Sequence, residues 1–418
     1  AGPDGWKEAV KDYDLSRRVE YITAPIKMIW TTNKAKLTTC EGAKEGIEAM
    51  RSVEFVVGQG HFLTATNQYA DIVLPITTAW EREGAYVWEG YMNRDILLIS
   101  RGFLPPFHEA KSDEEAMMCI GAKFGLTPEM WGTVSAKQRL FNAVAASTVI
   151  KEDGKSWENL VSITEEDIKE WGVEGTPQAG RVPIAKYMED GIYRVDRHIG
   201  DNFGFIHKKE FRDDPEGHPI STTSGKIEFA CQAWADILNS QGYSEEEYSA
   251  IPKYRVPTQG YQDTFVDRRL GGQKSAYPLQ CISPHYQRRA HSVFDNIPWL
   301  REACPNPVFL AKKDAAERGI SDGDTVKISS RYGETLRKAC VTARMMPGVV
   351  GLPHGPWLRV DETSGIDQSG AENYITGQVA RGLGCSGYNT LNVEVSRFDG
   401  AIPDDVEIPR SILFEQGG

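Results

Sequence analysis

The segment "RGISDGDTVKISSRYGE", residues 318–334, carries the signals of a helix end, a tight turn and a strand in immediate succession. Gly319 can end a short helix in the left-handed conformation, and Asp322 to Asp324 form a tight turn. Thr325 to Ser329 then alternate apolar and polar side chains, as a strand with one face in a core does. The pattern indicates backbone structure rather than chemistry.

Five further short runs with β-branched residues surround this segment between Tyr277 and Phe398. They are "PLQCI", "NPVFLA", "KACVTA", "GVVGLP" and "LNVEV", separated by Gly, Pro and Asp turns, and one helix-like insert, "AKKDAAERG", interrupts the series. Short strands at such spacing are typical of a closed β-barrel. We therefore predict a barrel domain over residues 275–418.

The N-terminal part has a β-α-β rhythm. The apolar runs "APIKMIWTTN", "VEFVVG" and "ADIVLP" stand around a helix-compatible segment that ends near Met50. These runs are too apolar for half-exposed strands, so they predict a parallel sheet covered on both faces. We assign residues 1–110 to an α/β domain. Its strand ends, near Asn33 and residues 58–62, lie where open α/β sheets bind ligands.

Residues 111–274 are predicted to form a connecting domain, partly α/β and partly irregular. Asp113 and Glu114 introduce an amphipathic helix, "EEAMMCIGAKFGL", and "SAKQRLFNAVAAS" predicts a second helix. From about 150 to 220 the chain has no clear hydrophobic period. We expect that stretch to run over the surface rather than to form a core of its own.

Composition limits the classes of function. The 418 residues include 47 basic and 59 acidic side chains, a net charge of -12, which argues against a broad nucleic-acid or anionic-membrane surface. Seven cysteines without CxxC spacing indicate mostly buried thiols rather than disulfides or a zinc site. The apolar runs are too short for a membrane span, and the first residues lack the features of an export signal.

A family resemblance rests on the run "YPLQCISPHYQRRAHSVFDNIPWLREACPNPVFLAKKDAAERGISDGDTVKISSRYGE", which is followed by "MMPGVVGLPHGPW". It resembles the C-terminal cofactor-binding barrel of the molybdopterin oxidoreductases of the dimethyl sulfoxide reductase family. Within that family it is most similar to the catalytic subunits of anaerobic dimethyl sulfoxide reductases. "QYADIVLPITTAWEREG" and "STTSGKIEFA" extend the resemblance over nearly the whole chain. It implies Rossmann-like sheet domains followed by a six-stranded barrel of the double-psi type.

Members of this family are much longer and carry an iron-sulfur cysteine motif and the metal ligand in their first half. The present chain resembles the second half. The resemblance therefore implies a fragment, or one piece of a split polypeptide, which lacks the metal ligand and has no turnover alone. Any 4Fe-4S cluster is expected on the missing N-terminal part.

The resemblance also implies a cofactor, two copies of molybdopterin guanine dinucleotide with molybdenum or tungsten. Ser, His and Arg side chains in a short loop can bind its pyrophosphate and pterin edge without a basic surface. By match to the family pattern, the contacts in "SPHYQRRAHSVFDN", residues 283–296, are Ser283, His285, His291 and Ser292. Arg289 is expected as a neighbour of the phosphate or pterin, and Asn296 is also assigned to the cofactor. As an alternative, His291 and Asn296 are buried polar groups that tie barrel loops together.

Three more positions are carried over from the family, and a fourth is assigned where the family's aspartate is replaced. Asn373 in "GAENYITGQ" and Asn389 in "CSGYNTLNVEV" match loops that face the pterins. In the sheet domain, Asn33 in "TTNKA" is retained without the proline that follows it in the family. The guanine contact in "VVGQGHFLTAT" is assigned to Gln59, with His61 as the alternative.

The resemblance implies an enzyme that reduces an S-oxide, an N-oxide or a related oxo compound by oxygen-atom transfer. It further implies an iron-sulfur electron-transfer subunit, a membrane anchor subunit and a place on the periplasmic side, or otherwise in the cytoplasm. Two alternatives stay open. One is a non-redox hydratase or hydroxyl-transfer member of the family, and the other is a non-catalytic cofactor-binding subunit.

Overall fold

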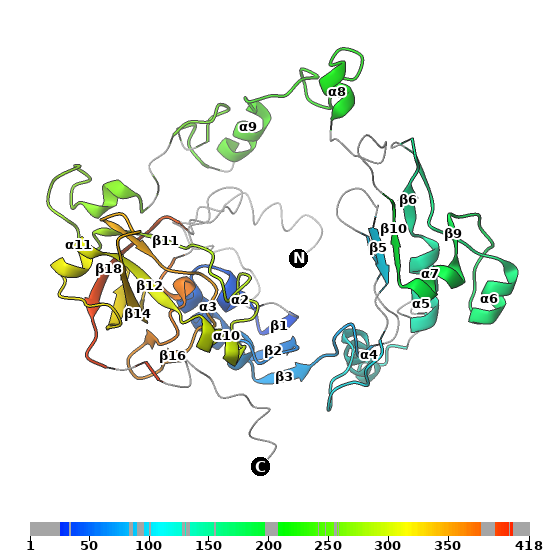
Figure 1. The fold of residues 1–418 in the computed structure, drawn as a ribbon, viewed down its shortest axis with the longest axis horizontal. Coiled ribbons are helices and arrows are strands. Elements are labelled where there is room, and N and C mark those ends of the chain that lie inside the picture. Colours follow the sequence, from blue (N-terminus) through cyan, green and yellow to red (C-terminus); the bar gives the residue numbers. More distant parts are fainter. Residues whose placement is uncertain are drawn as a thin grey trace. The chain divides into compact units, whose positions relative to one another are not determined.

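A computed structural model gives the architecture of the chain (Figure 1). It describes residues 26–32, 35–82, 87–89, 96–99, 102–127, 130, 134–153, 156–196, 208–240, 242–246, 248–254, 257, 259–377, 389–400 and 402–403. Contacts divide the chain into one unit of residues 1–73 and 229–418 and a second unit of residues 74–228. The domain boundaries after residues 110 and 274 stay predictions.

The first unit begins with a three-stranded sheet in the order β1-β2-β3. Its strands are β1 (Met28–Thr32), β2 (Phe55–Gly60) and β3 (Ile72–Pro75), with helices α2 (Lys36–Thr39) and α3 (Ala43–Ser52) between the first two. β1 and β2 are parallel, which confirms the predicted β-α-β arrangement. The expected burial on both faces holds for β2 alone. Met28 in β1 and Ile72 in β3 are exposed to 46% and 48% because their strands lie at the sheet edges.

Six strands then close into a barrel in the order β12-β15-β11-β18-β13-β14, and a parallel pairing of β14 with β12 completes the ring. The strands are β11 (Leu279–Ile282), β12 (Pro307–Ala311), β13 (Thr325–Ser329), β14 (Glu334–Thr342), β15 (Val349–Gly351) and β18 (Leu391–Arg397). Each strand overlaps one of the six runs singled out in the sequence. The predicted six-stranded barrel is therefore confirmed.

The turn signals around β13 act as expected. Gly319 has φ 63° just after helix α11 (Lys312–Glu317), and Gly323 has φ 83° in the following turn. The backbone N–H of Ser321 donates to the Asp324 carboxylate at 2.8 Å and fixes this turn. Val326 and Ile328 are completely buried in the barrel core.

The sheet packs on the barrel through one shared hydrophobic cluster, which joins Leu37 and Ile47 to Leu358 and Tyr374. Figure 1 shows β1 to β3 with their two helices beside the barrel strands. The connections of the first unit hold shorter elements: η1 (Asn67–Tyr69), α9 (Gln232–Ser240), η3 (Tyr261–Thr264), α10 (Pro298–Ala303), β16 (Val360–Asp361), β17 (Ile366–Asp367) and η4 (Glu372–Tyr374). Sheet domain and barrel are thus parts of one compact unit.

The second unit is built from short elements around an antiparallel sheet in the order β10-β5-β4. Its strands are β4 (Val87–Glu89), β5 (Ile96–Ile99), β6 (Thr148–Ile150), β7 (Trp157–Asn159), β8 (Val161–Ser162), β9 (Val182–Pro183) and β10 (Ile192–Arg194). Its helices are α4 (Asp113–Lys123), α5 (Ala136–Ala145), α6 (Glu165–Trp171), α7 (Ile184–Asp190) and α8 (Lys209–Asp213). α4 and α5 confirm the two predicted helices; Ser112 and Ser135 cap them by accepting backbone N–H groups.

Residues 150–220 contribute to a core, so the expectation of surface excursions was wrong. Leu160, Val161, Ile184 and Tyr187 are at most 1% exposed and pack with Phe141 in one cluster. The strands and helices here are two to seven residues long. Elements this short bury one or two side chains each, and therefore leave no extended period in the sequence.

Two smaller expectations were also tested. Of the six cysteines in the described part, all free, only Cys281 is buried, whereas Cys119 and Cys231 are exposed, so the prediction of mostly buried thiols was wrong. Among the described residues, no helix combines the length and the apolar character that a membrane crossing requires.

Candidate functional site

Three imidazoles converge at the end of β11 and in the loop after β15. His285 and His291 come from the loop predicted to contact a cofactor, and His354 follows β15. Their nearest ring nitrogens all lie within 4.8 Å of one another. His285 and His291 are exposed and His354 is half-buried. We call these three residues the histidine cluster.

Hydrogen bonds fix the ring of His354. Its Nδ1 lies 3.3 Å from the carbonyl oxygen of Ser283, and its Nε2 lies 3.2 Å from Nδ1 of His291. Burial lowers the pKa of His354, the bond to Ser283 acts in the opposite direction, and His285 and His291 lower the pKa further. The imidazole is therefore held in its neutral form over a wider pH range than a free histidine.

Ser283 also joins the cluster to a second barrel loop. Its backbone N–H donates to the side-chain oxygen of Asn389 at 3.0 Å. Asn389 is exposed, just before β18, so its amide lies beside the histidine cluster. The structure thus brings Ser283, His285, His291 and Asn389 together, four residues that the sequence assigned to one ligand.

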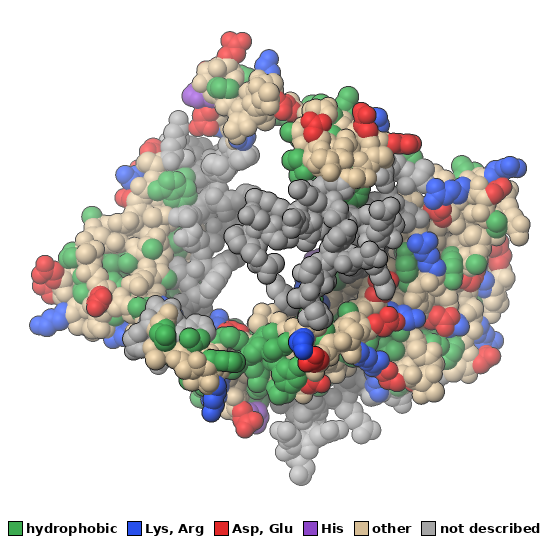
Figure 2. Space-filling view, turned by 180° about the vertical axis from the view of Figure 1, so that it is seen from behind, with side chains coloured by type: hydrophobic (Ala, Val, Ile, Leu, Met, Phe, Trp, Pro, Cys, Tyr) green, Lys and Arg blue, Asp and Glu red, His purple; other side chains and the backbone are tan. Residues whose placement is uncertain are grey.

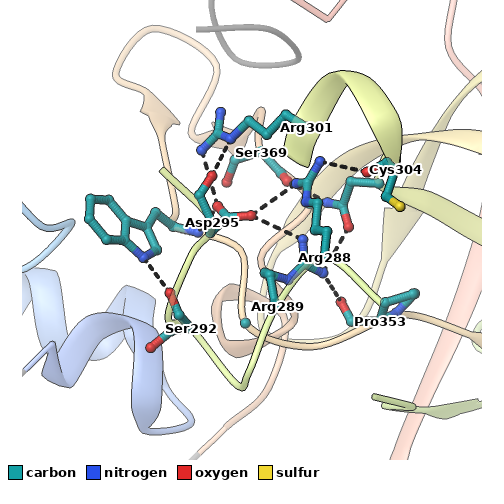
Figure 3. Close-up of polar contacts among 12 residues, drawn as sticks. Arg288, Arg289, Ser292, Asp295, Arg301, Cys304, Pro353 and Ser369 are labelled. Carbon is teal, nitrogen blue, oxygen red and sulfur yellow. Dashed lines mark hydrogen bonds and ion pairs between the residues drawn. The ribbon is translucent and has the colours of Figure 1, made fainter. Parts of the chain in front are cut away.

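Beneath the cluster, the Asp295 carboxylate is surrounded by three arginines (Figure 3). Its Oδ1 accepts from Arg288 at 2.9 Å and from Arg289 at 3.0 Å, and its Oδ2 accepts from Arg301 at 3.1 Å. Burial by itself raises the pKa of this carboxyl, but Arg301, Arg289 and Arg288 outweigh burial and lower it. Asp295 is only 1% exposed, and the three arginines therefore keep it ionised despite its burial.

Arg289 connects this buried charge to the histidine cluster. Its guanidinium donates to the carbonyls of His354 at 3.0 Å and Pro353 at 3.2 Å, and to the side chain of Asn306 at 2.9 Å. With the bond to Asp295, its nitrogens have partners within the chain. This geometry gives Arg289 a positioning role, and its contact with a cofactor stays a prediction.

Asp295 fixes the far side of the loop through Trp357. The backbone N–H of Trp357 donates to Asp295 Oδ2 at 2.9 Å, and its indole N–H donates to the carbonyl of Ser292 at 2.9 Å. Ser292 thus contributes its backbone to the loop geometry, and both Ser292 and Asn296 are half-buried. Contacts of their side chains with a ligand stay predictions.

Two further ionisable side chains of this region, Arg337 and Glu372, are buried. Arg337, 1% exposed, donates to the carbonyls of Pro307, Pro353 and Gly370, and burial lowers its pKa to about 9. Burial raises the pKa of Glu372 to about 7, although Arg337 acts against this shift. Glu372 Oε1 accepts the backbone N–H of Gly355 at 2.9 Å. This contact supports the residue that follows His354.

Asn373 lies between the barrel and helix α2. The side-chain N–H of Asn373 donates to the carbonyl of Thr38. The Thr376 hydroxyl donates to the backbone carbonyl of Asn373 at 3.1 Å. Its side-chain oxygen is buried and has no hydrogen-bond partner within the described part of the chain, nor has the Thr38 hydroxyl. Asn373 therefore ties the sheet domain to the barrel, while its pterin contact stays a prediction.

The strand-end residues of the sheet have a different environment. Gln59 is 1% exposed, and its side-chain oxygen accepts the indole N–H of Trp30 on β1 at 2.8 Å. His61 is exposed and its ring lies against Phe62, whose ring in turn contacts Trp357. Asn33 lies outside the described residues. A guanine contact by Gln59 or His61 stays a prediction.

Sequence reasoning missed His354, Asp295 and Glu372 as members of this site. His354 stands in "GLPHGPW", between a proline and a glycine. Proline and glycine at these positions indicate a turn or loop of defined backbone conformation. Asp295 follows the adjacent arginines by six and seven residues, a spacing that allows ion pairs across a tight loop. No local signal marks Glu372, because burial by distant segments causes its pKa shift.

Comparisons with known proteins give the family. Residues 7–120 match the molybdopterin oxidoreductase family, and residues 279–390 match the molydopterin dinucleotide binding domain. The chain belongs to the molybdopterin oxidoreductases. The second match contains the histidine cluster, Asp295 and Asn389, so the geometry described above belongs to a molybdopterin dinucleotide-binding domain.

Relatives of this molybdopterin oxidoreductase are similar over most of the chain. A probable dimethyl sulfoxide reductase chain, YnfF, of Escherichia coli K12 is 28% identical over 89% of the chain and 42% of its own length. The dimethyl sulfoxide reductase DmsA of the same strain is 28% identical over 87% of the chain and 41% of its length. The chain thus spans less than half the length of these relatives.

A solved structure supports the fold. Acetylene hydratase from Pelobacter acetylenicus superposes with a TM-score of 0.61 over 91% of the chain and 45% of its own length, at 18% identity. At this identity the likeness concerns the fold alone. It agrees with the arrangement of a parallel sheet and a closed barrel in this molybdopterin oxidoreductase.

The exposed residues of the site suit a molybdopterin dinucleotide. An imidazole, an amide and a hydroxyl can each donate and accept hydrogen bonds, as the edge of a pterin requires. His285, His291, Ser283 and Asn389 would hold such a group at the barrel loops. Arg289 already donates four hydrogen bonds to acceptors of the chain, so its role as a phosphate or pterin neighbour stays a prediction.

The surface charge agrees with local rather than broad anion binding. Figure 2 shows Lys and Arg side chains interspersed with Asp and Glu over the visible face of this family member. Of the four arginines near the site, Arg288, Arg289 and Arg337 are buried and Arg301 is largely so, at 10% exposed. Their positive charge therefore acts beneath the loops.

Proposed function

We propose that the chain is the dinucleotide-binding part of an enzyme that carries two molybdopterin guanine dinucleotides with molybdenum or tungsten. The observation that carries the proposal is the meeting of Ser283, His285, His291 and Asn389 on neighbouring barrel loops. The match of residues 279–390 to the molydopterin dinucleotide binding domain supports it. When bound, the cofactor supplies two-electron redox chemistry.

The reaction we propose is the reduction of an S-oxide or N-oxide. One substrate molecule, two electrons and two protons give the deoxygenated product and one water molecule. The names of the relatives, dimethyl sulfoxide and trimethylamine-N-oxide reductases of Escherichia coli K12, support this substrate class. We further propose that an iron-sulfur subunit supplies the electrons, with a membrane anchor on the periplasmic side.

The residues of this chain bind and orient in that reaction. His285, His291 and Asn389 present hydrogen-bonding groups to the pterin edge and the pyrophosphate. His354, held by Ser283, keeps the His291 ring in place through the 3.2 Å contact between ring nitrogens. Asp295 and Arg289 hold the backbone under these residues.

Cofactor analysis tests the proposal. The enzyme that contains this chain would be purified from a host that makes the guanine dinucleotide, and bound pterin, released GMP and metal would be measured. We expect two GMP per metal ion, lower pterin content for His285→Gln and Asn389→Ala, and unchanged content for His218→Gln. His218 is exposed and lies in the second unit, so it is a matched control. Wild-type pterin content in both site variants would contradict the proposal.

Substrate class is tested separately with the same preparation. Oxidation of a reduced viologen would be followed with dimethyl sulfoxide, trimethylamine N-oxide and an oxyanion such as selenate. We expect the two organic oxides to be reduced faster than the oxyanion. Turnover with selenate alone would contradict the proposed substrate class and leave the cofactor assignment intact.

A further inference from the structure

The histidine cluster has the arrangement of a metal site as well as of a cofactor contact. We propose that His285, His291 and His354 bind one divalent transition-metal ion, such as Zn²⁺, when the pterin cofactor is absent. Its three ligands are imidazoles, and the group contains no carboxylate.

The hydrogen bond of His354 orients it as a ligand. The Ser283 carbonyl can only accept, so Nδ1 of His354 carries the proton. Nε2 of the neutral ring then has the free lone pair and points at His291. Histidines that bind metals commonly donate their other ring N–H to a backbone carbonyl, which fixes the tautomer in this way.

The spacing of two ligand atoms fits tetrahedral coordination. At a zinc–nitrogen distance of about 2.05 Å, two nitrogens of a tetrahedral site lie about 3.3 Å apart. Nε2 of His354 and Nδ1 of His291 are separated by 3.2 Å. The nitrogen of His285 lies within 4.8 Å of both, and its exposed ring can rotate to close the remaining gap.

Backbone geometry keeps the two loops this close. His291 has φ 55°, a left-handed conformation that few non-glycine residues adopt. Gly355 has φ 95°, and a Cβ there would lie 1.9 Å from the His291 carbonyl oxygen. Only glycine therefore allows the chain after His354 to pass the backbone of His291, so the two imidazoles are placed before any ligand arrives.

Metal binding requires one proton to move within the cluster. Because Nδ1 of His354 carries its proton, the hydrogen in the contact between Nδ1 of His291 and Nε2 of His354 must come from His291. A metal needs both lone pairs, so the His291 proton shifts to its own Nε2, on an exposed ring. Three protein ligands then leave the fourth position to water, as in open zinc sites.

The ligand set selects the class of metal. Imidazole nitrogen suits zinc, copper, nickel and iron, whereas magnesium and calcium prefer oxygen ligands. The buried arginines around Asp295 carry more positive than negative charge and oppose a cation nearby. We therefore expect weaker binding than at a four-ligand structural zinc site.

Titration of the untagged, cofactor-free chain with Co²⁺ tests the site, followed by displacement with Zn²⁺ in a calorimeter. We expect one ion per chain, with the visible absorption of tetrahedral cobalt. His285→Gln, His291→Asn and His354→Gln should each weaken binding at least tenfold, and His218→Gln should leave it unchanged. Asn at position 291 suits the left-handed backbone, and thermal unfolding would confirm that each variant folds. Wild-type affinity in all three variants, or no bound ion, would overturn the proposal.

A second arm concerns competition and rests on the proposed function. Chain loaded with Zn²⁺ should take up less pterin cofactor than metal-free chain, and a chelator should restore uptake. Equal cofactor uptake with and without bound Zn²⁺ would show that the two ligands do not exclude each other, but it would not contradict the metal site itself. Absence of bound pterin in the enzyme that contains this chain would refute the proposed function, and the result of the metal titration would still stand.

Discussion

Arg289 donates from Nε to the backbone carbonyl of His354 at 3.0 Å while it forms an ion pair with Asp295 at 3.0 Å. One guanidinium thus links a buried carboxylate to the loop that carries a ring of the histidine cluster. The geometry of the exposed imidazoles therefore depends on a largely buried charge network. A buried network of this kind stabilises the loop only while all of its members are present.

The first prediction concerns Asp295→Asn. The substitution leaves Arg288, Arg289 and Arg301 without their counter-charge in a buried environment, so we expect a loss of about 3–5 kcal/mol in the free energy of unfolding. Urea unfolding of both proteins measures it. As a control, Glu362→Gln removes the exposed ion pair with Arg51 and should change stability by less than about 1 kcal/mol. Equal losses of unfolding free energy in the two variants would contradict a stabilising role for the buried charge network.

A second prediction uses the pKa of Glu372, raised from 4.5 to about 7. The folded protein binds this proton more tightly than the unfolded chain does. Protonated Glu372 therefore contributes its whole share of the unfolding free energy below pH 4.5, and this share is lost as the pH rises through about 7. Glu372→Gln removes this titration and can still accept from Gly355.

The expected result is a difference in pH dependence between wild type and Glu372→Gln. From pH 5 to pH 8 the wild type should lose up to about 3 kcal/mol of unfolding free energy relative to the variant. Urea unfolding at both pH values gives the comparison. A constant difference between the two proteins across this range would show that Glu372 does not titrate there.

The third prediction compares two glycines with positive φ. Gly355→Ala places a Cβ against the His291 carbonyl, so we expect a loss of about 2 kcal/mol or more and a lower cofactor content. Gly365 has φ 71° with open space around a Cβ, so Gly365→Ala should cost only about 1 kcal/mol of backbone strain. Thermal unfolding and pterin analysis of both variants distinguish the steric clash with the His291 carbonyl from the backbone strain that both alanines share. Similar losses in both would remove the special role of Gly355.

The barrel could be predicted from sequence because its signals are local. Each of the six strands is a short run whose alternation and flanking turns are visible within about ten residues, as Thr325 to Ser329 show. The core around Leu160 and Tyr187 could not be predicted, because its members come from elements too short to show a period. Burial there is decided by contacts between distant segments.

The same distinction applies to the candidate site. Ser283, His285, His291 and Asn389 were assigned by resemblance, and the structure brings them together. The environments of Arg289 and Gln59 depend on partners far along the chain, the His354 carbonyl and the Trp30 indole. A sequence motif fixes which residue is present, whereas only the fold decides whether its polar atoms are already in use.

The last prediction separates two asparagines that the sequence treated alike. Asn373 is 3% exposed and donates to the Thr38 carbonyl, so Asn373→Ala leaves a buried acceptor unpaired and should cost about 1–3 kcal/mol. Hydrogen exchange should then rise at residues 36–39, on α2, while β13 and β18 in the barrel stay protected. Asn389 is exposed and accepts from Ser283 N–H, so Asn389→Ala should lower cofactor content with little change in exchange at α2. If Asn373→Ala instead lowers cofactor content and leaves exchange at α2 unchanged, Asn373 serves the ligand rather than the contact between sheet and barrel.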